Sequence, residues 1–364
     1  MLVKFSVKNF RGFPQKIEWD LSNSSNYDFN TYAIKDGIVK NGIIYGPNGS
    51  GKTNFGLAVF DIVNHLTQKK KLSGYYENFA YAGAIDTPVE FDYLFKFGAD
   101  TVEYSYSKDK FGLLLSETVI HNGNTVLSRG GESIMVKDFK INEQAKQLLL
   151  QGANNFSLVN FILSSFPVTK TFYLMQMKEF VDSMLWYQCL ERRDFLGLDV
   201  SSTNIEEYII KNRLVEDYVH FLKEVGGQEF SFSTPQKDDK QLWCEYAGAR
   251  IPFQSILSTG TSALELLYFW MQKLPVSKFV FIDEFDAFYH FSLSKAVCRK
   301  LFEMDCQLFL SSHNTLLMTN DLLRPDCNFL LDGNKIRPLC DCTDKELRYG
   351  HNIEKLYRGN AFSL

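Results

Sequence analysis

The sequence predicts an α/β protein built around a phosphate-binding loop, and three observations carry this prediction. Residues 46–53 read Gly-Pro-Asn-Gly-Ser-Gly-Lys-Thr, which fits the pattern G-x-x-x-x-G-K-[ST]. An apolar run at 43–45 predicts a buried strand before this loop, and the apolar spacing over 54–66 predicts a helix after it. A second apolar run, at 279–282, predicts another buried strand that ends in two acidic residues.

Composition indicates an ordinary globular chain. Its 364 residues are 45% hydrophobic and 23% charged, enough for one large core and a subsidiary lobe. The net charge of −4 argues against a surface that coats DNA generally, although a local nucleic-acid groove remains open. Seven scattered cysteines without a C-x-x-C pair suggest free thiols. With no signal peptide and no membrane span in the pattern, we expect a cytoplasmic protein and no membrane contact.

The first part of the chain, 1–140, predicts half of the nucleotide-binding domain together with an antiparallel β subdomain. Residues 2–8 alternate apolar and polar side chains, as a half-buried strand does, and a second short strand is expected at 16–21. From 88 to 127, strand-like segments are separated by turn residues such as those at 122–124. This pattern predicts an antiparallel meander.

The middle of the chain, 141–228, predicts a helical insertion lobe. Helical spacing occurs at 143–150, at 170–192 and at 204–224. The last part, 229–364, returns to strands and is expected to complete the nucleotide-binding domain. None of these stretches sustains the heptads of a long coiled coil.

The phosphate loop defines the expected cofactors, ATP and Mg²⁺. Its backbone N–H groups would point at phosphate oxygens, helped by the positive end of the following helix. The loop residues expected to bind the phosphates in this way are Asn48, Gly49, Ser50 and Gly51. Lys52 would reach the β- and γ-phosphates, and the Thr53 hydroxyl would hold Mg²⁺.

Three catalytic or metal-binding residues are expected at the ends of two downstream strands. Asp283 would hold Mg²⁺, which prefers hard oxygen ligands, and Glu284 would polarise the attacking water as a general base. A further apolar strand at 307–312 ends in His313, whose neutral imidazole can hydrogen-bond the γ-phosphate or the water. Carboxyl ends of parallel strands meet at one edge of a sheet, where ligands bind in such folds.

A second anion site is expected at Ser258 and Gly260, at the start of a predicted helix. Because the chain's own phosphate loop already has Lys52, this site would serve a nucleotide held by another copy. We therefore expect a homodimer, or a larger oligomer, with ATP at the subunit joint. A plain helix N-cap is the alternative for Ser258.

The order of these motifs resembles an ABC-type ATPase head of the recombination and structural-maintenance kind. Within that superfamily, four segments resemble the bacterial AAA15/AAA21 ATPases of abortive-infection and other anti-phage systems. The segments are 7–13, 282–286 together with His290, 312–314, and 351–359. The resemblance covers the two ends of the chain and says little about 60–250.

The resemblance implies further roles. Arg11 would lie near the nucleotide phosphates, and Asp286 would belong to a loop that crosses the dimer joint. It also implies an ATPase that acts as the sensor or switch of a defence system and controls an effector, such as a nuclease or toxin from a neighbouring gene. Thr261 occupies the position after Ser-x-Gly where Glu or Gln is usual in the family. The glutamine that the family places in a lid over the nucleotide is not assigned to a residue of this sequence. Both departures bear on the hydrolysis rate.

Two other functions stay open at this point. The main alternative is a DNA-repair or recombination ATPase that clamps DNA in its ATP-bound dimer. Another is an effector enzyme, for instance an RNase, that uses the helical lobe or the corner at 348–351, although no paired catalytic partners accompany that corner. A transporter ATPase subunit fits the terminal motifs least.

Overall fold

The framework of the protein is a pair of seven-stranded sheets. A computed structural model of the chain describes residues 1–22, 25–69, 71–131, 133–151, 156–189, 194–197, 204–235 and 239–364. Helices cover the sheets and form a lobe beside them, so the predicted α/β class is confirmed.

The core sheet runs in the order β12-β11-β15-β16-β5-β17-β18. Its strands are β5 Asn41–Tyr45, β11 Leu185–Gln188, β12 Phe195–Leu196, β15 Phe279–Asp283, β16 Gln307–Ser312, β17 Asn328–Asp332 and β18 Lys335–Pro338. The five inner strands pair in parallel, whereas both edge strands are antiparallel. Every residue of β5, β15 and β16 is buried, which explains their uninterrupted apolar sequences.

The second sheet is antiparallel, in the order β10-β9-β8-β7-β6-β1-β2. Its strands are β1 Leu2–Lys8, β2 Ile17–Asp20, β6 Val89–Phe97, β7 Asp100–Lys108, β8 Leu114–His121, β9 Asn124–Gly130 and β10 Ser133–Val136. The predicted meander is thus confirmed. It is larger than expected because β1 pairs with β6 and brings β2 with it.

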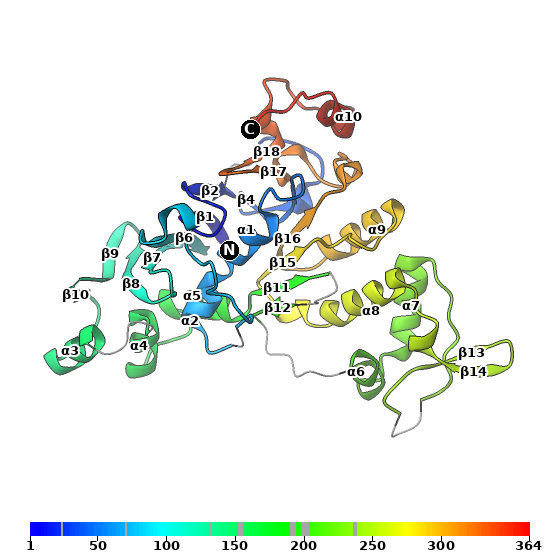
Figure 1. Ribbon diagram of the computed structural model, residues 1–364, viewed down its shortest axis with the longest axis horizontal. Coiled ribbons are helices and arrows are strands. Elements are labelled where there is room, and N and C mark those ends of the chain that lie inside the picture. Colours follow the sequence, from blue (N-terminus) through cyan, green and yellow to red (C-terminus); the bar gives the residue numbers. More distant parts are fainter. Residues whose placement is uncertain are drawn as a thin grey trace.

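The helices are α1 Lys52–Val59, α2 Asp61–Leu66, α3 Glu143–Gln151, α4 Leu158–Ser165, α5 Tyr173–Asp182, α6 Ile205–Lys211, α7 Val215–Gly226, α8 Thr259–Met271, α9 Phe291–Phe302 and α10 Ile353–Arg358. Two small sheets pair β3 Ile34–Lys35 with β4 Ile38–Val39, and β13 Trp243–Tyr246 with β14 Ala249–Pro252. In Figure 1 the antiparallel sheet lies to the left of the core sheet, and α6 and the β13–β14 hairpin project at the lower right.

One predicted helix is partly wrong. The helix expected over 170–192 ends at Asp182, and the chain then forms β11, which pairs in parallel with β15. Leu185, Trp186 and Tyr187 are almost completely buried, and such large apolar residues favour a central strand as readily as a helix. Residues 190–193 lie outside the described residues. The domain boundaries stay a prediction, but the predicted lobe at 141–228 contributes this strand to the core sheet.

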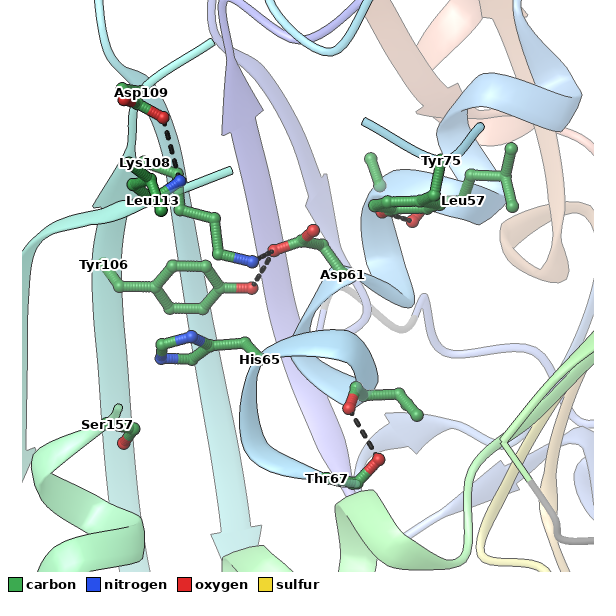
Figure 2. Close-up of polar contacts among 12 residues, drawn as sticks. Leu57, Asp61, His65, Thr67, Tyr75, Tyr106, Lys108, Asp109, Leu113 and Ser157 are labelled. Atoms are coloured by element: carbon green, nitrogen blue, oxygen red, sulfur yellow. Dashed lines mark hydrogen bonds and ion pairs between the residues drawn. The ribbon is translucent and has the colours of Figure 1, made fainter. Parts of the chain in front are cut away.

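Helix α2 is anchored to the antiparallel sheet by buried polar groups. The Lys108 ammonium on β7 lies 2.6 Å from Asp61 Oδ2 at the start of α2, and both side chains are buried. Tyr106 OH donates to the same oxygen at 2.8 Å, as Figure 2 shows. One turn later, His65 Nε2 lies 2.7 Å from Tyr104 OH. These contacts fix the helix pair α1–α2, which begins at the phosphate loop, against β7.

Candidate nucleotide-binding site

The phosphate loop joins β5 to α1 at one edge of the core sheet. Two of its glycines are required sterically. A Cβ on Gly46 would lie 2.4 Å from Ser50 Oγ and 2.5 Å from the Leu331 carbonyl oxygen. Gly51 has φ +99°, a conformation that favours glycine, and a Cβ there would lie 2.9 Å from the ring of Phe13. The tip of the loop, at 47–49, is exposed.

Lys52 lies inside the curl of the loop. Its Nζ donates to the carbonyl oxygens of Gly46 at 2.9 Å and Pro47 at 3.2 Å. It also lies 3.2 Å from His313 Nδ1. Because an ammonium only donates, Nδ1 accepts here, and the proton of a neutral His313 ring lies on Nε2. Burial lowers the pKa of Lys52, while the nearby carboxylates of Glu284 and Asp283 oppose that shift.

Thr53 and Asp283, the two residues predicted to hold Mg²⁺, are in direct contact. Thr53 Oγ1 donates to Asp283 Oδ2 at 2.7 Å, and Ser311 Oγ donates to Asp283 Oδ1 at 2.6 Å. Asp283 is completely buried, and this burial raises the pKa of its carboxyl, although both hydroxyl donors act in the opposite direction. The structure therefore brings together residues far apart in sequence, with the hard oxygen atoms that Mg²⁺ prefers.

Glu284 and His313 form the accessible side of this cluster. Glu284 has φ +48°, an uncommon conformation for a residue other than glycine. Its backbone N–H donates to Ser311 Oγ at 2.8 Å, so one serine hydroxyl holds both Asp283 and the next residue. Glu284 Oε1 lies 3.8 Å from His313 Nε2. Sequence reasoning missed Ser311, and the only available signal was the Ser-Ser pair that precedes His313.

Asp286 follows on the same segment and is held within its own chain. Ser312 Oγ donates to Asp286 Oδ2 at 2.8 Å, and burial raises the pKa of this carboxyl. This bond joins the segment after β15 to the end of β16. The role of Asp286 at a dimer joint stays a prediction.

Arg11 lies beside the first turn of α1. Its Nη1 donates to Asn54 Oδ1 at 3.2 Å, and its Nη2 donates to the Tyr75 carbonyl oxygen at 3.0 Å. The guanidinium also lies 5.4 Å from the ring centroid of Tyr75. Burial lowers the pKa of Arg11. Asn54 follows Thr53 directly, so Arg11 lies close to the phosphate loop. Its place near the nucleotide phosphates stays a prediction.

A cavity of about 960 Å³ opens next to these residues. Its lining includes Arg11, Thr53, Asn54, Trp186 and Gln188. Gln188 ends β11 at the position paired with Asp283 in the register of the sheet. Sequence reasoning missed Gln188 because a helix was expected there. The volume lies in the range typical of small-molecule sites.

Ser258 and Gly260 are placed differently. Ser258 caps α8, and its Oγ accepts from the Thr261 N–H at 3.1 Å and lies 2.7 Å from Thr261 Oγ1. Neither Ser258 nor Gly260 lines the cavity beside α1, and no hydrogen bond among the described residues joins them to the phosphate loop. A Cβ on Gly260 would lie 3.3 Å from the Phe288 carbonyl oxygen, so the first turn of α8 packs against the segment after β15. Within one chain, therefore, Ser258 is an N-cap.

The residues present fit a magnesium nucleotide. Ser50 Oγ, at the centre of the loop, is buried and has no hydrogen-bond partner among the described residues, although buried hydroxyls normally have one. A phosphate oxygen would supply that partner. The described residues contain no group of three or more His, Cys, Asp or Glu side chains suited to a metal, and all seven cysteines are free thiols. No described helix has the length and apolar character that crossing a membrane requires.

Comparison with known proteins gives a likeness of fold. No protein-family model matches the chain, and no curated protein matches its sequence. An SMC head bound to the C-winged helix domain of ScpA matches at 15% identity and a TM-score of 0.48, covering 93% of this chain and 97% of the other. The SMC head domain from Thermotoga maritima matches at 18% identity and a TM-score of 0.44, covering 93% and 98%.

A Pyrococcus yayanosii Smc head domain with a coiled coil and joint matches at 11% identity and a TM-score of 0.49, covering 99% of each chain. At these identities and scores, the likeness adds nothing to the assignment of individual site residues. The site rests on its own geometry.

Proposed function

We propose that the protein is an ABC-type ATPase that binds and hydrolyses ATP with Mg²⁺. The contact of 2.7 Å between Thr53 Oγ1 and Asp283 Oδ2 is the observation that supports this most directly. It joins the phosphate loop to the strand that carries the acidic pair, with Lys52 and Glu284 on either side. A chance glycine-rich turn has no reason to place its threonine on a buried carboxylate.

Each residue then has a defined task. Lys52, released from the carbonyl oxygens of Gly46 and Pro47, binds the β- and γ-phosphates, while the loop N–H groups and Ser50 hold the other oxygens. Thr53 and Asp283 would hold Mg²⁺, whose charge would offset that of the phosphates. Gln188, at the same edge of the sheet, would supply a third oxygen ligand for Mg²⁺ from its side-chain amide. The cavity beside Asn54 and Arg11 takes the remainder of the nucleotide.

Glu284 is the proposed general base. It is partly accessible, and its backbone is fixed by Ser311, so its carboxylate can accept a proton from a water next to the γ-phosphate. His313 donates from Nε2 on the same side and orients the reacting oxygen. Because Lys52 holds His313 Nδ1 in the acceptor role, phosphate binding by Lys52 and the orientation of His313 are coupled.

We further propose that Ser258 and Gly260 complete the site of a second copy. A helix N-terminus carrying Ser-x-Gly is suited to an anion, yet it has no place in the site of its own chain. A head-to-tail pair of copies would put each α8 N-terminus against the other copy's phosphates. The proposed biological role, a switch that controls an effector in anti-phage defence, is supported by the motif resemblance alone.

Hydrolysis by the purified chain tests the enzymatic proposal. Lys52→Ala should abolish nucleotide binding or hydrolysis, since the loop loses its only side-chain cation. Glu284→Gln should bind ATP normally and lower turnover by about a hundredfold or more, the range that general-base catalysis contributes. Phosphate release and binding of a fluorescent ATP analogue, measured side by side, separate the two effects. Wild-type turnover by Glu284→Gln would contradict the assignment of the base.

A further inference from the structure

A second cavity, of about 430 Å³, lies outside the nucleotide site. It is bordered by α9, by the 3₁₀ helix η5 Thr315–Leu317 and by the turn before α10. Three large apolar side chains on its lining are exposed: Phe291 by 38%, Leu316 by 42% and Tyr349 by 59%. Twelve such side chains are exposed in the described residues, so a quarter of them gather here. Clustered exposed apolar groups mark an interaction surface.

One wall of this cavity is held rigid by a buried asparagine. Asn320 is 5% exposed, and its Nδ2 donates to the carbonyl oxygens of Arg348 at 3.0 Å, Tyr349 at 3.0 Å and His351 at 3.2 Å. The Arg348 N–H donates to His351 Nδ1 at 3.1 Å. The turn that presents Tyr349 is thus fixed before any partner binds, which lowers the entropic cost of association.

The other two walls continue directly from the nucleotide site. Helix α9, which begins at Phe291, follows the segment that carries Glu284 and Asp286, and η5 follows His313. Ser312 Oγ ties these two segments together through its bond of 2.8 Å to Asp286. Strands β15 and β16 run in parallel, so both segments leave the core sheet at the edge where the phosphate loop lies.

We infer that this cavity is part of the contact surface for the second copy of the chain, with Phe291, Leu316 and Tyr349 as its apolar anchors. The inference rests on the proposed head-to-tail pair. A copy whose Ser258 reaches the phosphate loop would cover this edge of the core sheet, the edge from which α9 and η5 lead to the cavity.

The charges at the margin of the cavity fit an interface as well. Lys295 is paired with Asp321, and Arg358 is paired with Glu354. An apolar centre with paired charges at the rim is the usual anatomy of a protein contact.

ATP-dependent dimerisation tests this inference. In a Glu284→Gln background, Leu316→Asp and Tyr349→Asp should each raise the dimer dissociation constant by about tenfold or more, as loss of a buried anchor does. The constant is measured by sedimentation velocity with Mg²⁺ and ATP. Leu316→Met keeps an apolar side chain and should dimerise normally. Val276→Asp is the matched control and should dimerise normally. Val276 is 65% exposed and lies just before β15, at the amino ends of the parallel strands and away from the phosphate loop.

Monomer integrity is checked by thermal unfolding and by binding of a fluorescent ATP analogue, which the Asp variants should retain because neither residue touches the nucleotide. Failure of Glu284→Gln itself to associate would count against the head-to-tail pair. Association of Glu284→Gln together with equal association of both Asp variants would overturn only the inference about the cavity, and would leave it as a surface for another protein.

Discussion

Asp283 is subject to two opposing requirements. It is fully buried, which disfavours its charge, but metal binding requires the ionised carboxylate. The hydroxyls of Thr53 and Ser311 lessen the conflict, because both donate to its oxygens. Even so, burial dominates and raises the pKa of Asp283. The residue is therefore expected to reduce the stability of the metal-free protein while it serves catalysis.

Asp283→Asn tests this trade-off. Because the folded pKa is raised, the carboxyl contributes stability below its unfolded pKa, and that contribution is lost as pH rises through the folded pKa. Without nucleotide, the variant should therefore become more stable relative to the wild type as the pH rises from about 4, the unfolded pKa of Asp, to about 7. Hydrolysis should fall by about a hundredfold or more, since metal ions supply several kcal/mol of charge stabilisation.

Thermal unfolding of both proteins at the two pH values gives the first result, and phosphate release gives the second. Ser311→Ala provides a control that removes one donor to Asp283 and keeps the carboxylate. A wild type that becomes more stable than Asp283→Asn as pH rises would show that hydrogen bonding outweighs burial at this carboxyl.

Residues of the site differ in how far the sequence reveals them. Lys52, Thr53 and Asp283 follow local patterns whose chemistry requires those residue types at that spacing, and the structure brings them together. Ser311 and Gln188 belong to no such pattern. Each lies near Asp283 only because its own strand, β16 or β11, pairs with β15. Their positions become visible only when the order and register of β11, β15 and β16 are known.

At the scale of elements, α2 and β7 are joined by a buried ion pair. Lys108 and Asp61 are 2% and 0% exposed, and they lie 2.6 Å apart. Burial lowers the pKa of Lys108, while Asp61 raises it. Such a pair contributes little net stability as a whole, yet removing one partner leaves a buried charge unpaired.

A double-mutant cycle at this pair should be strongly non-additive. Asp61→Leu and Lys108→Met should each lower the free energy of unfolding by about 3–5 kcal/mol, because each leaves the other charge buried. The double variant should recover most of that loss. Urea unfolding of the four proteins gives the coupling energy. Losses that simply add would show that the two residues act independently and that α2 is held by apolar packing.

The helices and strands also differ in how well the sequence predicts them. Alternation predicts β1, and strand-like segments between turn residues predict the meander. Strands β6 and β7 show the physical reason, because buried and more accessible residues alternate along much of each. Strand β11 was mistaken for helix, since a short apolar run is compatible with both and only its pairing with β15 decides. The helix expected over 54–66 is divided at Phe60 into α1 and α2, a break that the apolar spacing does not reveal.

At the scale of the whole molecule, the proposed pairing has a consequence that single variants cannot show. Each site would take Lys52 from one copy and Ser258 from the other, as in a symmetric dimer. Lys52→Ala and Ser258→Arg should each be inactive alone. In an equimolar mixture, half of the dimers combine the two variants, and each of these has one intact site and one doubly defective site. The mixture should therefore recover about a quarter of wild-type hydrolysis, the share of intact sites in random pairing.

Phosphate release at a fixed total protein concentration measures this recovery. The order of addition matters, because the copies must exchange before ATP closes the dimer. A mixture of Lys52→Ala with Glu284→Gln is the control: both defects lie on the same side of the joint, so each mixed dimer has two defective sites and no activity should return. Ser258 is an N-cap of α8 within its own chain, so wild-type hydrolysis by Ser258→Arg alone would reduce it to that structural role and remove the reason for pairing the copies head to tail.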